Sequence, residues 1–167
     1  MYEIAIGPPM KLYHGSNVVV EKPRLLQSDR RLDFGPGFYC TSSYDQAARW
    51  ATITAKRRGE GTAIVSAYDF DEHALGDLLV LSFPTANKDW LAFVGANRRG
   101  VASGEWDIII GPVANDSTMP VLKLFFANIY TEEEAIRRLL PQKLKDQYAL
   151  RTQASLDLLH FSEVIEL

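Results

Sequence analysis

The chain alternates short β-rich runs with segments of helical spacing, and the alternation has no regular strand–helix–strand order. This pattern limits the fold more than any other feature and is typical of α+β proteins. The β-rich runs predict strands over residues 11–14, 37–41, 62–70, 78–83, 106–111, 147–151 and 161–165. We expect the strands at 62–70 and 78–83 to pair as a hairpin-like unit.

Both capping residues and the spacing of apolar residues indicate where the helices lie. Ser42 or Ser43 caps a helix that ends near Gly59. Further helices are predicted over residues 86–97, 117–128, 131–140 and 153–159. Pro120 falls in the first turn of its helix, where a missing N–H costs little.

The length of 167 residues and the 47% hydrophobic content fit one domain with a sizeable core. Met10 stands directly before the first strand and is an alternative start. We therefore interpret residues 1–9 as a short leader and residues 10–167 as the single domain. The leader lacks the basic region and the apolar run of a secretory signal, and no stretch is long and apolar enough to cross a bilayer.

Cysteine usage and charge narrow the class of protein further. Cys40 is the only cysteine and has no metal-ligand spacing around it, so we expect a reducing, cytoplasmic setting without a metal. The net charge of −3 argues against a broad nucleic-acid footprint. The basic runs Lys56–Arg58 and Arg98–Arg99 are interpreted as a solvated helix end and loop. The alternative is a local basic edge that contacts NAD phosphates or a macromolecular target.

Two motifs near the amino end carry the strongest functional signal. The first strand ends in Tyr-His-Gly-Ser at 13–16, and the second is entered through Asp-Phe-Gly-Pro-Gly-Phe-Tyr at 33–39. A histidine at a strand end can be oriented toward a ribose hydroxyl, and a glycine lets a ligand approach the backbone. Each motif alone also fits an ordinary strand and turn. Both together, in this order, are much less expected by chance.

The pair of motifs resembles the NAD-binding core of ADP-ribosyltransferases of the diphtheria-toxin and poly-ADP-ribose polymerase type. The resemblance implies an ADP-ribosyltransferase-like split β-sheet core with surrounding helices, in which two neighbouring strands clamp nicotinamide. His14 would bind the adenosine ribose, and the Gly15 backbone would bind the nicotinamide amide. Ser16 would bind the nicotinamide side, and no metal is required.

The same resemblance gives roles to the second motif. Tyr39 matches the aromatic residue that stacks on nicotinamide. Gly35 and Gly37 form the Gly-x-Gly entry to its strand and count among the expected NAD-binding residues. Asp33 precedes this entry and would contact the adenine-ribose end of NAD.

A third element departs from the family pattern. Transferases of this type usually place a glutamate at the start of a later strand, where it holds the nicotinamide-ribose 2′-hydroxyl. The matching residue is Gln147, which with His14 and Tyr39 would form the catalytic set. A neutral amide supplies no charge. Either the enzyme is limited to mono-ADP-ribosylation, or another carboxylate substitutes, or the chain binds NAD without turnover. The candidate carboxylates are Asp33, Asp107 and Asp116.

The charged neighbours of Gln147 are divided by the alternation of a strand. Asp146 is expected on the opposite face, whereas Arg151 shares the face of Gln147 and is a candidate contact to the pyrophosphate or the target.

Three later segments, at 90–100, 106–116 and 146–152, resemble a bacterial family of predicted transferases of this fold. The resemblance implies a mono-ADP-ribosyltransferase with NAD as donor, and its compact core suits the toxin of a toxin–antitoxin pair. A protein, a nucleic acid and a small molecule all stay open as acceptor. The alternatives are a catalytically inert module that binds NAD or ADP-ribose, and an NAD glycohydrolase.

Overall fold

A computed structural model describes residues 9–25, 32–101, 104–114 and 117–167 of the chain. In these ranges the fold is α+β, as predicted, with two sheets and five α-helices. The strands are β1 (Met10–Ser16), β2 (Phe38–Cys40), β3 (Ile64–Phe70), β4 (Val80–Ser82), β5 (Ile108–Pro112), β6 (Asp146–Leu150) and β7 (Leu159–Glu166). The helices are α1 (Tyr44–Arg58), α2 (Lys88–Arg98), α3 (Met119–Phe126), α4 (Glu132–Leu139) and α5 (Gln153–Leu156). The predicted leader falls almost wholly outside the described residues.

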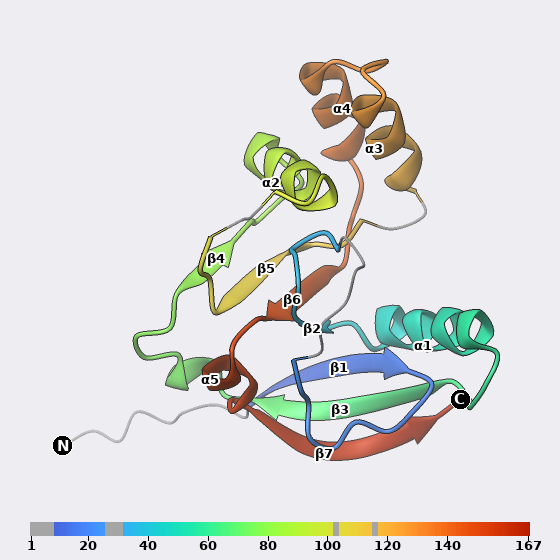
Figure 1. Ribbon diagram of the computed structural model, residues 1–167, viewed down its shortest axis with the longest axis vertical. Helices are drawn as coiled ribbons and strands as arrows, with labels where there is room; N and C mark the ends of the chain where they lie inside the picture. The colour runs from blue at the N-terminus through green and yellow to red at the C-terminus, as the bar shows by residue number, and fades with distance from the viewer. Residues whose placement is uncertain (1–8, 26–31, 102–103, 115–116) are drawn as a thin grey trace.

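The strands of the described residues form two sheets, and a backbone bridge joins them. An antiparallel sheet has the order β1-β3-β7, and a mixed sheet has the order β2-β6-β5-β4 (Figure 1). An isolated bridge links them, in which Tyr13 of β1 and Thr41 exchange backbone hydrogen bonds of 2.8 and 2.9 Å. The strands that carry the two amino-terminal motifs therefore lie side by side, although they belong to different sheets.

The expected hairpin between β3 and β4 is wrong. β3 pairs with β1 and β7, whereas β4 pairs in parallel with β5 in the other sheet. The connecting segment contains a 3₁₀ helix, Glu72–Ala74, and carries the chain from one sheet to the other instead of turning it back. Helix α2 then supplies the crossover that a parallel pair of strands requires.

Local capping chemistry places the helix ends close to their predicted positions. The Ser43 side chain accepts a hydrogen bond from the Gln46 N–H at the start of α1. Gly59, with φ 69°, ends α1 in the left-handed conformation that favours glycine. α5 ends at Leu156, earlier than predicted, because β7 already begins at Leu159.

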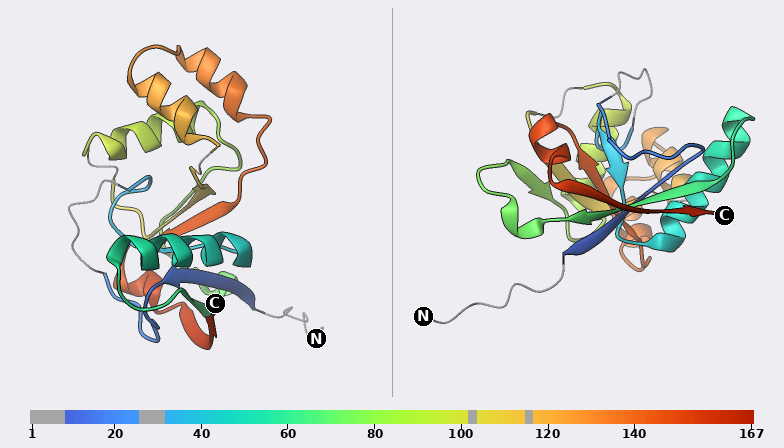
Figure 2. Two further views of the ribbon diagram at one scale, coloured as in Figure 1. Left: turned by 90° about the vertical axis from the view of Figure 1, so that its right-hand side faces the viewer. Right: turned by 90° about the horizontal axis from the view of Figure 1, so that it is seen from below.

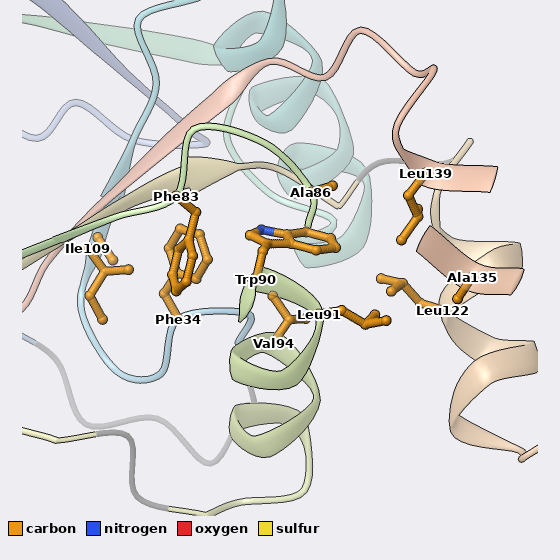
Figure 3. Packing of buried hydrophobic residues seen from close by; sticks show 11 residues of the cluster. Phe34, Phe83, Ala86, Trp90, Leu91, Val94, Ile109, Leu122, Ala135 and Leu139 are labelled. Atoms are coloured by element: carbon orange, nitrogen blue, oxygen red, sulfur yellow. The ribbon is translucent and has the colours of Figure 1, made fainter. Parts of the chain in front are cut away.

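Clusters of buried apolar residues hold the sheets and helices together. Trp90 of α2 lies between the mixed sheet and the helices α3 and α4, with Leu91 and Val94 beside it (Figure 3). A second cluster draws on both sheets and contains Leu12, Phe38, Cys40, Tyr68, Phe70, Ile108, Leu150, Leu156 and Leu159. Helix α1 lies along β1 and covers the antiparallel sheet (Figure 2). None of the described helices has both the length and the apolar character needed to span a membrane.

Candidate functional site

A cavity of about 1050 Å³ lies where the two sheets meet. Its walls come from β1, β2, β6 and α1, from the segment that follows β1, and from the end of α2. The cavity brings together the predicted site residues His14, Gly15, Ser16, Asp33, Gly37, Tyr39 and Gln147. Its volume is at the upper end of the range of small-molecule sites.

His14 is held at the end of β1 in a defined tautomer. Its Nδ1 lies 2.7 Å from the backbone oxygen of Tyr39, and because a carbonyl only accepts, Nδ1 carries the proton. The imidazole stacks on the Phe38 ring, with 4.2 Å between the ring centroids. Burial lowers the pKa of His14, and the positive charge of Arg58 acts in the same direction. A neutral His14 presents Nε2 as a hydrogen-bond acceptor, which suits a hydroxyl donor.

Tyr39 is fixed through its hydroxyl and offers the cavity its ring. The hydroxyl accepts a hydrogen bond from the Phe34 N–H at 3.0 Å and donates to the Gly35 oxygen at 2.6 Å. Burial raises the pKa of the Tyr39 phenol, so it stays un-ionised. Gly35 has φ 79° and does not line the cavity, so its observed contact is the hydrogen bond that positions Tyr39.

Gln147 is buried, with 3% of its surface exposed, and its amide has a fixed orientation. Nε2 donates to Oδ2 of Asp33 at 3.2 Å and to the Pro112 oxygen at 3.4 Å. Because both partners are acceptors, the amide nitrogen faces them and Oε1 is directed away from Asp33. Gln147 can therefore act toward a ligand as a hydrogen-bond acceptor.

Asp33 links Gln147 to Arg98. The Asp33 side chain is 8% exposed, and its Oδ1 accepts a hydrogen bond of 2.8 Å from Nε of Arg98. This pairing compensates the burial of the carboxylate. Arg98 is 31% exposed and lines the cavity, so its interpretation as part of a solvated loop is wrong. The sequence signal for this contact was the basic end of α2, but the pairing with Asp33 was missed.

The second candidate carboxylate, Asp107, lies outside this cavity and has a bracing role. Its two oxygens accept hydrogen bonds from the Leu79 N–H at 2.8 Å and from the Thr152 hydroxyl at 2.7 Å. These contacts tie the segment before β4 to the start of α5. The third candidate, Asp116, lies outside the described residues.

The faces of β6 divide Asp146 from Gln147, as predicted. Asp146 accepts a hydrogen bond from the Ser42 N–H at 2.8 Å, on the opposite side of the strand from Asp33. Arg151 lines a separate cavity of about 500 Å³ and donates to the Pro36 oxygen at 3.3 Å. The observed geometry does not bring Arg151 into the cavity of His14.

Of one wall of the cavity, the sequence indicated only Arg57 and Arg58, as part of a basic run. This wall is a face of α1, and we call the residues Arg49, Trp50, Ile53, Thr54, Arg57 and Arg58 the α1 wall. Their i, i+4 spacing was the available signal. Gly15 lets the helix approach β1, because a Cβ on Gly15 would overlap the Ala47 oxygen and lie 2.7 Å from the Ala51 nitrogen.

The described residues contain no group of three or more His, Cys, Asp or Glu side chains arranged to hold a metal ion. Comparison with protein families matches residues 10–161 to a family described as "Protein of unknown function (DUF3990)". No match was found among curated proteins.

Proposed function

We propose that the chain, which belongs to this family of proteins of unknown function (DUF3990), is a mono-ADP-ribosyltransferase that uses NAD as donor. The main support is that His14, Tyr39 and Gln147 line one cavity although they come from three strands of two sheets. These are the residues for which the sequence resemblance implied roles in NAD binding and cleavage.

The cavity has groups that fit each part of the donor. Nε2 of neutral His14 would accept a hydrogen bond from an adenosine-ribose hydroxyl, and the Tyr39 ring would stack on nicotinamide. Oε1 of Gln147 would accept from the 2′-hydroxyl of the nicotinamide ribose. The bond between nicotinamide and ribose C1′ breaks, and its electron pair leaves with nicotinamide. The acceptor nucleophile then bonds to C1′ and releases its proton to solvent.

Asp33 offers a substitute for the missing catalytic charge. Its carboxylate accepts a hydrogen bond from the Gln147 amide, which increases the negative character of Oε1. The developing positive charge on the ribose would then be stabilised through Gln147. Asp33 would act as a positioning residue, in place of its expected contact to the adenine ribose.

A catalytically inert module that binds NAD or ADP-ribose is the second candidate, and one observation favours it. The Asp33 carboxylate is paired with Arg98, so the charge next to Gln147 is largely neutralised. A site of this kind can hold NAD and give little stabilisation to a cationic ribose.

Incubation of the protein with NAD labelled in the adenosine part, with and without cell lysate, tests the proposal. A transferase places label in lysate macromolecules and releases nicotinamide. His14→Ala should abolish labelling, and His160→Ala, which changes an exposed histidine of β7, should retain it. Free ADP-ribose as the sole product would identify a glycohydrolase. Intact NAD together with measurable binding would identify the inert module.

The biological setting forms part of the same proposal. We infer that the enzyme acts in the cytoplasm as the toxin of a bacterial toxin–antitoxin pair, and the support is the sequence resemblance. Induced expression without a partner should slow growth of a bacterial host, and His14→Ala should restore it. Equal growth of wild type and His14→Ala, at equal protein levels, would remove the support for a toxin.

A further inference from the structure

The cavity is cationic although the chain as a whole is acidic. The whole chain has 18 basic and 21 acidic residues, whereas six basic and two acidic side chains among the described residues line the cavity. The basic ones are Lys22, Arg24, Arg49, Arg57, Arg58 and Arg98. They come from the segment after β1, from α1 and from the end of α2, so the fold concentrates positive charge from three distant segments.

Two of the arginines that line the cavity lie on an exposed face of α1. They are Arg49 and Arg57 of the α1 wall, and both are exposed. They are two helical turns apart, which is about 12 Å along the axis. Their positive charge is therefore spread along the wall of the cavity, as contact with successive phosphates of a strand requires.

Aromatic and apolar surface lies between the charges. Ile53 stands between Arg49 and Arg57 on the same stripe of α1 and is 46% exposed. Trp50, on the neighbouring stripe, is partly exposed and also lines the cavity. Surfaces that bind single-stranded nucleic acids combine these two features, because cations follow the phosphates and aromatic rings stack on the bases.

We propose that the α1 wall binds a short segment of single-stranded nucleic acid. The phosphates contact Arg49 and Arg57, and a base stacks on Trp50. The concave shape of the cavity favours a flexible strand over a flat membrane surface, and the acidic remainder of the chain keeps the contact local. The binding requires no NAD cleavage, so it goes beyond the proposed function and is tested apart from it.

Fluorescence anisotropy with labelled DNA and RNA oligonucleotides of about ten nucleotides, a length in the range of basic–aromatic grooves, measures this binding without NAD. Affinity should fall as salt rises, and Arg49→Gln or Arg57→Gln should each reduce the log–log salt slope by about 0.7. Trp50→Ala should weaken binding by about tenfold or more. Lys56→Gln is the matched control, because Lys56 is an exposed neighbour on α1 that does not line the cavity.

The melting temperature with and without NAD, measured on the same variants, separates the strand site from the donor site. Arg49→Gln and Arg57→Gln should keep the NAD-induced shift while they lose oligonucleotide affinity. Loss of the NAD shift with unchanged oligonucleotide affinity would assign both arginines to the donor and overturn the proposal. Binding to anionic vesicles but to neither oligonucleotide would overturn it as well, in favour of a membrane surface.

Discussion

The protonation of His14 links the candidate site to the stability of the fold. Burial, the largest cause, lowers the pKa of His14 below the usual value of about 6.5. Below that pH the unfolded chain binds a proton that the folded chain does not. The free energy of unfolding therefore decreases as the pH is lowered from about 6.5 to the folded pKa. We expect the melting temperature of wild type to fall more steeply between about pH 7 and pH 5 than that of His14→Gln, because only wild type has this titration.

A control separates this effect from general acid sensitivity. His160→Gln removes an exposed histidine on β7 and should keep the wild-type slope. Parallel melting curves for wild type and His14→Gln across this pH range would contradict the lowered pKa of His14.

The contact between Gln147 and Asp33 explains why an amide suits this position of β6. Gln147→Glu would place a second carboxylate within hydrogen-bond distance of Asp33. Two such groups share a proton, which raises the pKa of the pair. The penalty is absent below about pH 4.3, grows as the pH rises above this value, and becomes constant above the raised folded pKa. We expect a loss of melting temperature that is larger at about pH 8 than at about pH 5.

Exchange of the two groups tests the same contact with the net charge restored. Asp33→Asn alone leaves Arg98 without its counter-ion and should cost less than the 3–5 kcal/mol or so of a fully buried pair, because Arg98 is 31% exposed. The double variant Asp33→Asn/Gln147→Glu should recover stability relative to the sum of the single changes, measured by a double-mutant cycle in urea. Strict additivity would show that the two side chains do not interact.

Among the elements, α1 and β1 depend on each other through Gly15. Gly15→Ala forces α1 away from β1, because the new Cβ meets helix backbone, and should destabilise by about 1–3 kcal/mol or more. Gly59→Ala is the comparison: its Cβ meets nothing within 4 Å, but φ 69° costs about 1–2 kcal/mol. Both variants should lower the melting temperature. Gly15→Ala alone should also remove the NAD-induced shift, and its retention would mean that the α1 wall does not define the cavity.

The elements that were predicted correctly depend on neighbours in the sequence. Three such features are the Ser43 cap, the Gly59 terminus and the proline in the first turn of α3. Each acts over a few neighbouring residues, so the sequence alone indicates it. The false hairpin of β3 and β4 shows the limit. The sequence of a short β-rich run does not indicate which strand it pairs with. β4 pairs with β5, which follows α2 in the chain.

In the candidate site too, the sequence indicated the local features but not the contacts between distant residues. His14 and Tyr39 stood out because their motifs are compact and ordered along the chain. The contact from Gln147 to Asp33 spans 114 positions, and no local pattern indicates it. Arg98 was noted only as part of a basic run, because its partner is decided by how α2 ends against the second motif.

At the scale of the whole molecule, Cys40 lies in the cluster that joins the two sheets. Its side chain is fully buried, and burial raises the pKa of its thiol, so it does not react while the structure is closed. Cys40 is also the only cysteine of the chain. Its rate of alkylation therefore measures how often the two sheets open.

NAD bound across the sheets should slow this alkylation. A ligand that binds only the closed form reduces the open population by 1 + [NAD]/Kd, so NAD at 100 times its Kd should slow labelling about 100-fold. His14→Ala should label at the same rate with and without NAD, because the variant lacks the proposed contact to the ribose. Saturating NAD could raise the melting temperature of wild type and still leave the labelling rate unchanged. In that case the alkylating reagent reaches Cys40 while NAD stays bound. The two sheets would then separate without disturbing the cavity. The expectation that NAD holds the two sheets together would be wrong.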